Sequence, residues 1–223
     1  TGQYSRSSPI QIPGTWTDVA CGTNRSYGIK TNGELYCWGY NQNGTLGLNE
    51  QYNPHKSSPT QIHGGGTNWA KFATSCDNSI QAIKTDGTLW GWGGGGFVYN
   101  QPTNSSRSSP TQMPGTNWSE VSSSYNSIWA TKTDGTLWSW GGNDDGQLGH
   151  NNQNPSGISS PTQIGTNTNW LTGTQTNQGV TAINTDGELW SWGYNGNGAL
   201  GHNNSHPVNY SSPTQIPGTW GSV

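Results

Sequence analysis

The feature that most constrains this chain is a nine-residue pattern that occurs four times. It consists of Thr, an Asp-Gly or Asn-Gly pair, and a strand-like run that ends in Trp-Gly, at residues 31–39, 85–93, 133–141 and 185–193. Such pairs suit the positive φ values of a tight hairpin turn, and the alternation of Leu-Trp-Ser-Trp has the period of a β-strand. Large residues point to both faces of this strand, so each copy is expected inside a stack of sheets.

A second pattern, Ser-Ser-Pro-x-Gln, repeats in step with the first. Its prolines lie 50 to 52 residues apart, at Pro9, Pro59, Pro110, Pro161 and Pro213. A repeat of about fifty residues is typical of propeller blades or solenoid units. We therefore expect one array over residues 1–223, with units at about 7–56, 57–107, 108–158 and 159–210 and a partial unit at 211–223. Because the chain starts and ends at nearly the same phase, it is expected to be either a segment of a longer array or a product cut from one.

Each complete unit contains four predicted strands, which in the first unit are residues 9–12, 16–21, 26–30 and 35–38. The proline of the first segment places it at a sheet edge. The loops after the first, third and fourth Trp strands contain Asn-x-x-Gly-x-Leu-Gly. After Gly93 the loop is glycine-rich and shorter, because 17 residues separate Gly93 from Pro110 whereas 20 separate Gly39 from Pro59. The expected fold class is all-β, built from four-stranded antiparallel blades.

Composition excludes several classes of protein. Only 27% of the 223 residues are hydrophobic, but 11% are aromatic and only 9% are charged, which is unlike a disordered chain. The core must therefore combine the 13 Trp residues with Leu and Ile packed on small residues. The net charge is -3 and the basic residues are dispersed, so no nucleic-acid partner is expected. No apolar run approaches the ~20 residues that span a bilayer, so no membrane insertion is expected.

The titratable residues form no recognisable catalytic or metal site. The cysteines lack the spacing of metal ligands, and free thiols are expected, with a Cys21–Cys37 disulfide across adjacent strands as the alternative. The five His residues are expected to be solvated loop residues. A carboxylate recurs before the turn glycine, at Asp86, Asp134 and Asp186. The first unit has Asn32 at this position, which favours a turn role over acid–base catalysis. We therefore expect no catalytic residue, no metal and no cofactor.

The combination of Val19-Ala20-Cys21-Gly22, the Asp-Gly turn, Leu-Trp-Ser-Trp-Gly and Asn-x-x-Gly-x-Leu-Gly resembles the repeat of the regulator of chromosome condensation family, over essentially the whole chain. The resemblance implies a β-propeller of four-stranded blades, usually seven in that family. Four complete units are too few for that ring, so either further residues or chains complete it, or the units stack as an open array. The family's nucleotide exchange on the small GTPase Ran depends on a wedge inserted into one blade, and its chromatin binding depends on basic tails. This sequence contains neither.

Recognition is expected on the loops that follow the Trp strands, because the loop sequences change while the framework repeats. Tyr and Asn together supply a flat apolar surface and amide hydrogen-bonding groups, which suit a protein partner or a sugar. For the Asn residues, a turn-capping role is an equally good interpretation. The candidate binding residues are Tyr40, Asn41, Tyr99, Asn143, Tyr194 and Asn195.

The favoured function is a non-enzymatic structural or binding module displayed on a virus (phage) particle or outside the cell, such as a fibre, decoration or adhesin domain. Its partner would be a protein or a cell-surface glycan. The alternative is a cytoplasmic protein-interaction propeller of the regulator type, and an enzyme is a third hypothesis that would need convergent titratable groups. Self-assembly, or completion of the propeller by further repeats, is compatible with either of the first two.

Overall fold

The computed structural model describes residues 8–50, 55–64, 66–74, 79–94, 106–124, 127–153, 157–176, 178–204 and 208–221. The first eight strands are β1 (Trp16–Gly22), β2 (Arg25–Lys30), β3 (Leu35–Gly39), β4 (Lys56–Gln61), β5 (Trp69–Thr74), β6 (Ser79–Lys84), β7 (Leu89–Gly93) and β8 (Arg107–Gln112). The remaining elements are β9 (Trp118–Ser123), β10 (Ser127–Lys132), β11 (Leu137–Gly141), β12 (Ile158–Gln163), β13 (Trp170–Gln175), β14 (Gly179–Asn184), β15 (Leu189–Gly193), the 3-10 helix η1 (Gly196–Gly198) and β16 (Tyr210–Ile216).

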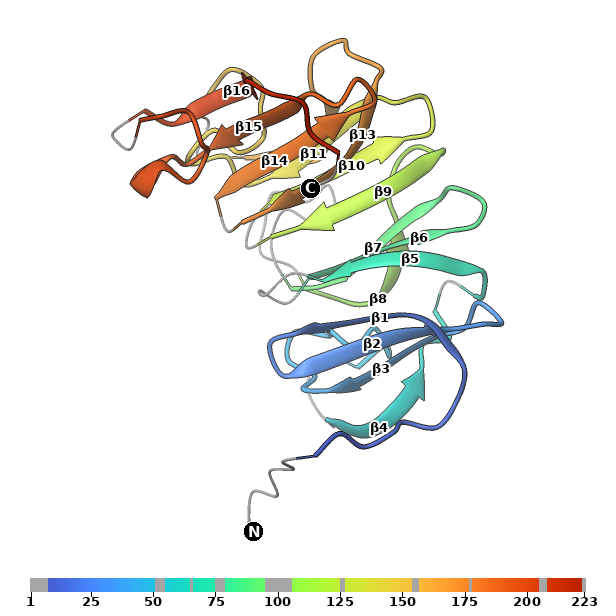
Figure 1. Cartoon of the computed structure of the whole chain (residues 1–223). Coiled ribbons are helices and arrows are strands. Elements are labelled where there is room, and N and C mark those ends of the chain that lie inside the picture. The colour runs from blue at the N-terminus through green and yellow to red at the C-terminus, as the bar shows by residue number, and fades with distance from the viewer. Residues whose placement is uncertain are drawn as a thin grey trace.

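The strands form four sheets, each a four-stranded antiparallel meander of consecutive strands, as the sequence predicts. We call them blade 1 (β1–β4), blade 2 (β5–β8), blade 3 (β9–β12) and blade 4 (β13–β16). The blades are stacked in chain order, and the first strand of each blade contacts the neighbouring blade (Figure 1). The fold is therefore a consecutive set of propeller-type blades.

The sheets divide the chain at a different phase from the sequence repeat. Each Ser-Ser-Pro strand pairs with the Trp strand that precedes it, as in the pairs Tyr36 with Gln61 and Trp90 with Gln112. A blade therefore begins at a Trp and ends at a Ser-Ser-Pro strand, which is the predicted edge strand. The strand predicted at residues 9–12 is wrong, since these residues form no strand. The physical reason is that a Ser-Ser-Pro segment pairs with the Trp strand before it, and the described residues include no Trp strand before residue 9.

The hairpin turns follow the predicted turn chemistry. The Asp86 carboxylate accepts hydrogen bonds from the backbone N–H of Thr88 at 2.9 Å and from its hydroxyl at 2.6 Å, while Gly87 has a φ of 75°. The Thr88 hydroxyl oxygen then accepts a hydrogen bond from Trp90 Nε1 at 2.9 Å. The hydrogen bonds from Thr88 hold the pKa of Asp86 below its usual range. This carboxylate therefore closes a turn and is not placed to act as an acid or base.

The core lies between the blades and is mainly aromatic. Trp92, Trp140 and Trp192 are completely buried. In blade 2, Trp92 and its partly buried neighbour Trp90 both lie 6.0 Å from the Trp69 ring, in T-shaped contacts that recur in blade 4. The expectation that each Trp strand lies inside a stack of sheets is confirmed, because buried Trp rings supply the core in place of aliphatic side chains.

Cys21 and Cys37 are free thiols, one exposed and one buried. Cys21 pairs with Ser26, which in turn pairs with Trp38, so that Cys21 and Trp38 share one face of blade 1. Cys37 is the next residue along β3 and therefore points to the opposite face. The alternative of a Cys21–Cys37 disulfide is wrong for this reason. Burial raises the pKa of the Cys37 thiol, which packs as a small apolar side chain.

Candidate functional site

The candidate binding residues lie on the loops that join the third strand of each blade to the fourth. In all four blades the third strand ends, and the fourth begins, on the same side of the molecule, on the left in Figure 1, while the Asp-Gly hairpins lie on the other side. We call this side the loop face; its described parts are residues 40–50, 55, 94, 106, 142–153, 157, 194–204 and 208–209. Tyr99 lies outside the described residues.

The three candidate Asn residues are turned inward. Asn41 is 1% exposed; its side-chain oxygen accepts a hydrogen bond from the Leu46 N–H at 3.1 Å, and its side-chain nitrogen donates to the Glu50 carbonyl at 3.1 Å. Asn143 and Asn195 are buried in the same way and bind the backbone N–H of Leu148 and Leu200. These amides hold the loop conformation and do not offer hydrogen-bonding groups to a partner. The turn-capping interpretation therefore describes them.

The two described Tyr residues behave differently from the Asn residues beside them. Tyr40 is 39% exposed and Tyr194 is 41% exposed. The Tyr40 ring stacks on the His55 imidazole, with ring centroids 4.5 Å apart, and His55 Nδ1 accepts a hydrogen bond from the Asn41 N–H at 3.1 Å. Tyr194 lies against Gly196, where an added Cβ would come within 2.0 Å of the phenol oxygen. Both rings are therefore oriented by their own loops while part of each faces solvent.

The corresponding loop of blade 3 has no tyrosine: buried Gly142 stands at that position, and Asp144 and Asp145 follow Asn143. Burial raises the pKa of Asp145, and a hydrogen bond of 3.0 Å from the Asn209 side chain of blade 4 partly offsets this effect. The aspartate thus helps to join two blades. The loop face therefore differs in chemistry from blade to blade: blades 1 and 4 expose a tyrosine, and blade 3 presents aspartates.

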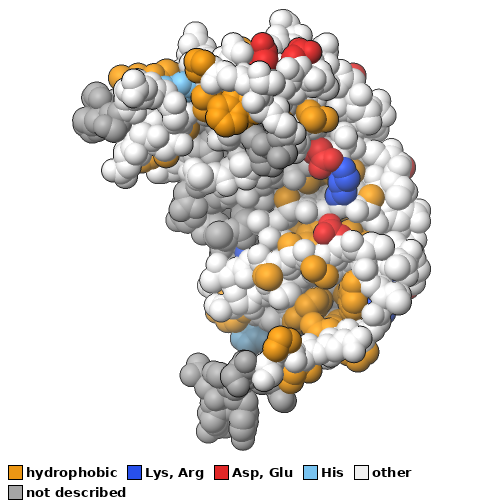
Figure 2. Space-filling model, viewed as in Figure 1, with side chains coloured by type: hydrophobic (Ala, Val, Ile, Leu, Met, Phe, Trp, Pro, Cys, Tyr) orange, Lys and Arg blue, Asp and Glu red, His pale blue; other side chains and the backbone are white. Residues whose placement is uncertain are grey.

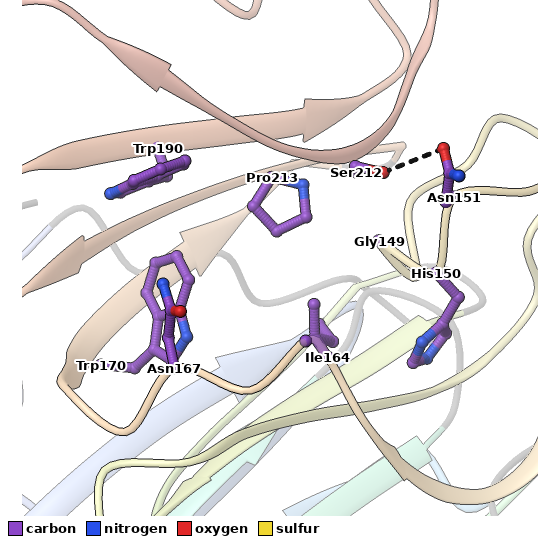
Figure 3. Close-up of a pocket in the computed structure, with 10 residues that line it drawn as sticks. Gly149, His150, Asn151, Ile164, Asn167, Trp170, Trp190, Ser212 and Pro213 are labelled. Atoms are coloured by element: carbon purple, nitrogen blue, oxygen red, sulfur yellow. Dashed lines mark hydrogen bonds between the residues drawn. The ribbon is translucent and has the colours of Figure 1, made fainter.

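A pocket of about 380 Å³ lies between blades 3 and 4, and the sequence analysis did not find it. Figure 3 shows its walls: the rings of Trp170, Trp190 and Pro213, with His150 and Asn151 at one side. The Ser212 hydroxyl donates a hydrogen bond to the Asn151 side-chain oxygen at 3.3 Å, so part of the polar rim is already engaged. The pocket suits a flat or apolar group. The residues that line the pocket come from separate segments of the repeat. The recurring Trp and Ser-Ser-Pro residues are the one sequence signal that could have pointed to the pocket.

Several histidines are structural and are not simply solvated, which corrects the sequence-based expectation. His150 Nε2 lies 3.0 Å from the Ser139 hydroxyl oxygen, and that hydroxyl donates to the Leu148 carbonyl at 2.7 Å. Burial lowers the pKa of His150. His202 makes the same contact with Ser191 at 2.9 Å. These residues fasten the ends of the loops to the Trp strands.

The described residues contain no group of three or more His, Cys, Asp or Glu side chains that could hold a metal ion. In the same part of the chain, no helix is long and apolar enough to cross a membrane. Charged side chains are also sparse on the face drawn in Figure 2. Two ion pairs in the described ranges are Lys56 with Glu50 at 3.2 Å and Lys71 with Glu120.

Comparison with known families matches the description "Regulator of chromosome condensation (RCC1) repeat" at residues 16–45 with one family model, and at residues 32–80, 134–174 and 186–221 with a second. Together these ranges cover more than half of the chain. A similar protein is the ultraviolet-B receptor UVR8 of Arabidopsis thaliana, which is 27% identical over 204 residues covering 89% of this chain and 45% of the receptor.

Two solved structures share the fold. Human WBSCR16 superposes with a TM-score of 0.78 at 24% identity, covering 93% of this chain and 54% of its own. Prp20p of Saccharomyces cerevisiae, whose structure was described with its binding to Gsp1p and histones, superposes with a TM-score of 0.78 at 17% identity, covering 95% and 52%. The chain thus spans about half the length of each of these three relatives.

Proposed function

Because this chain belongs to the regulator of chromosome condensation repeat family, we propose that it is a non-catalytic, intracellular protein-interaction module that binds a protein partner through its loop face. Among the similar structures, Prp20p is described as binding Gsp1p and histones, which are protein partners. The favoured hypothesis of a virion or extracellular module with a glycan partner finds no support among the relatives. The alternative, an interaction propeller of the regulator type, agrees better with them.

The observation that carries this proposal is the contrast between Tyr40 and Asn41. The Asn side chain is buried and fixes the loop, while the Tyr next to it is stacked on His55 and remains 39% exposed. On blade 4, Tyr194 is likewise exposed and Asn195 is likewise buried. An aromatic side chain held in one orientation loses little conformational entropy when a partner covers it, and Tyr is enriched at protein interfaces for this reason.

Nucleotide exchange is not part of the proposal. The resemblance ties that activity to a wedge inserted into one blade, and this sequence holds no such insertion. The described residues also lack a cluster of titratable groups around the pocket of Figure 3 that would suit catalysis, since His150 is engaged with Ser139. A binding role requires only the rigid blades and the exposed rings.

The test compares the wild-type chain with two variants in affinity capture from lysate, followed by mass spectrometry. The double variant Tyr40→Ser, Tyr194→Ser should lose specific protein partners that the wild type retains. Leu171→Ser is the matched control, because Leu171 is also an exposed hydrophobic residue, at 51%, but lies in β13 and not on the loop face. If the double variant keeps every partner of the wild type, the loop face is not the binding surface.

A glycan array probed with the same labelled proteins forms the second part of the test. Binding to immobilised glycans that disappears in the double variant would favour the carbohydrate hypothesis over the protein partner. Absence of glycan binding, together with a protein partner that the double variant loses, is the expected result.

A further inference from the structure

The contact between adjacent blades has a repeated form that can be described as a knob and a socket. In the contacts of blade 1 with blade 2 and of blade 3 with blade 4, the knob is the second Trp of the following blade. Its indole Nε1 donates to a loop carbonyl of the preceding blade: Trp92 to Thr45 and Trp192 to Gln147, each at 3.0 Å. The socket also needs a glycine, since a Cβ on Gly47 would lie 2.8 Å from Trp92 Nε1.

Blade 1 carries a knob with no socket. Trp38 occupies the position of Trp92 and Trp192, yet it is partly exposed, and its Nε1 has no acceptor among the described residues. A pocket of about 390 Å³ adjoins it, lined by apolar side chains that include Ile10 and Val19, which are 59% and 64% exposed. Figure 2 shows hydrophobic side chains gathered over this blade. The same sheet face is covered by the preceding blade in blades 2 and 4.

Blade 4 carries a socket with no knob. Ala199 and Gly201 occupy the positions of Thr45 and Gly47, but both are exposed, whereas Thr45 and Gly47 are buried. Among the described residues, a Cβ on Gly201 would meet only the Ile216 Cδ1 within 4 Å, at 3.4 Å, so none of them fills the space that Trp92 fills beside Gly47. Ile216 itself is partly exposed, although its counterpart in blade 1, Ile62, is 1% exposed.

We propose that two copies of this chain associate head to tail, with Trp38 of each copy inserted into the Ala199–Gly201 socket of the other. The occupant is a second copy because the two open faces continue an interface that the chain already forms between its own blades. A head-to-tail contact made twice closes a ring of two copies, whereas one that does not close yields a filament. This assembly goes beyond the proposed partner binding.

The C-terminal residues oppose this association. Residues 211–221 differ from residues 7–17 only at Thr214 and Gly221. Accordingly, the Trp220 N–H donates to the Gly187 carbonyl at 2.9 Å, as the Trp69 N–H donates to the Gly33 carbonyl at 3.0 Å. Trp220 therefore stands where Trp16 of the second copy must lie, and it has to move aside on association. Trp220 is 40% exposed and follows the last strand, so displacing it disrupts no sheet.

The test is sedimentation velocity of the whole chain over a wide concentration series. The wild type should pass from the mass of one chain to that of two, and Trp220→Ser should associate more tightly. Trp38→Ser should weaken association by at least about 30-fold, the loss expected at an interface hot spot. Gly201→Asn should do the same by filling the socket; all eight described non-glycine residues with positive φ are Asn, so this substitution keeps the backbone. Leu171→Ser, the control, should associate like the wild type.

Mixing Trp38→Ser with Gly201→Asn sharpens the test, because the mixture contains one intact knob and one intact socket. The mixture should associate although neither variant does alone. Chemical unfolding of each variant at low concentration checks that the single chains remain folded. The proposal is overturned if the wild type and Trp220→Ser stay single chains at every concentration, if association ignores both interface variants, or if species larger than two copies predominate.

Discussion

Two contacts between blades bury the same residue type, a Trp, but differ in whether its indole N–H has a hydrogen-bond acceptor. One is the contact between blades 3 and 4, and the other is the contact between blades 2 and 3. Trp192 and Trp140 are both 0% exposed. Trp192 Nε1 donates to the Gln147 carbonyl, whereas Trp140 Nε1 is buried and has no acceptor among the described residues. Because a buried donor without a partner costs free energy, the apolar contact alone must hold the second interface at this point.

The difference originates in the loop of the preceding blade. The loop of blade 3 contains Asn143 to Gly149, and it reaches blade 4 through the Asn151 N–H, which donates to the Ser211 carbonyl at 2.6 Å. The loop of blade 2 lacks the Asn-x-x-Gly-x-Leu-Gly segment, and residues 95–105 lie outside the described part. Between blades 2 and 3, Lys71 instead binds Glu120 and donates to the Ser119 carbonyl at 3.2 Å. A repeat protein can thus keep one aromatic framework and vary how strongly its units are joined.

The largest effect is expected from removing the aromatic knobs. Trp192→Ala and Trp140→Ala should each lower the free energy of unfolding by ~3–5 kcal/mol, as for other fully buried aromatics. Trp38→Ala should cost clearly less, because Trp38 is partly exposed and covered by no preceding blade. Denaturant unfolding at a concentration where the chain is single measures all three. Equal losses at Trp38 and Trp140 would show that the interblade burial described above does not determine stability.

The second effect concerns the socket glycines. Gly47→Ala places a methyl group 2.8 Å from Trp92 Nε1 at a residue with a φ of 71°, so overpacking and backbone strain should together cost about 1–3 kcal/mol. Gly201→Ala has a similar φ of 75° but only Ile216 nearby, so it should cost less, about 1 kcal/mol from the left-handed backbone. Thermal unfolding of the two variants gives the difference. A larger loss at Gly201 would contradict the assignment of an open socket.

A smaller effect isolates the hydrogen bond itself. Trp192→Phe keeps most of the buried ring but removes the donor to the Gln147 carbonyl, whereas Trp140→Phe removes a donor that has no described acceptor. Trp192→Phe should therefore be more destabilising by about 1 kcal/mol. Equal costs for both substitutions would mean that Trp140 also has an acceptor in the native chain.

The smallest effect is a pH dependence at blade 3. Burial lowers the pKa of His150, so the folded chain keeps this imidazole neutral while the unfolded chain protonates it at about 6.5. The associated stability is present above that pH and is lost as the pH falls below it toward the folded pKa. His150→Leu copies Leu48, its counterpart in blade 1, and should flatten this part of the stability curve. If the stability of the variant depends on pH as that of the wild type does, the pH dependence comes from another titratable group.

Local residue patterns were sufficient to predict the hairpin turns and the strands that follow them, but they wrongly predicted a strand at residues 9–12. Asp86-Gly87-Thr88 forms its turn through contacts within three residues, and the alternation in Leu89–Gly93 places Trp90 and Trp92 on one face whatever lies opposite. The same local reasoning was insufficient for the candidate site. Tyr40 and Asn41 are adjacent polar loop residues in the sequence, and only the fold shows that one ring is exposed and one amide is buried.

The sequence by itself therefore determined the repeat, with its four hairpins, their Trp strands and the blade-like units. It also determined that the recurring carboxylates belong to turns. The tertiary structure decided which strand closes which sheet, because the partner of Gln61 is Tyr36, many residues earlier in the chain. It also decided that Trp38 lacks the cover that Trp92 has, because that cover comes from a neighbouring blade and not from flanking residues. Contacts within a few residues follow from residue type and period, whereas contacts between blades depend on how whole sheets stack.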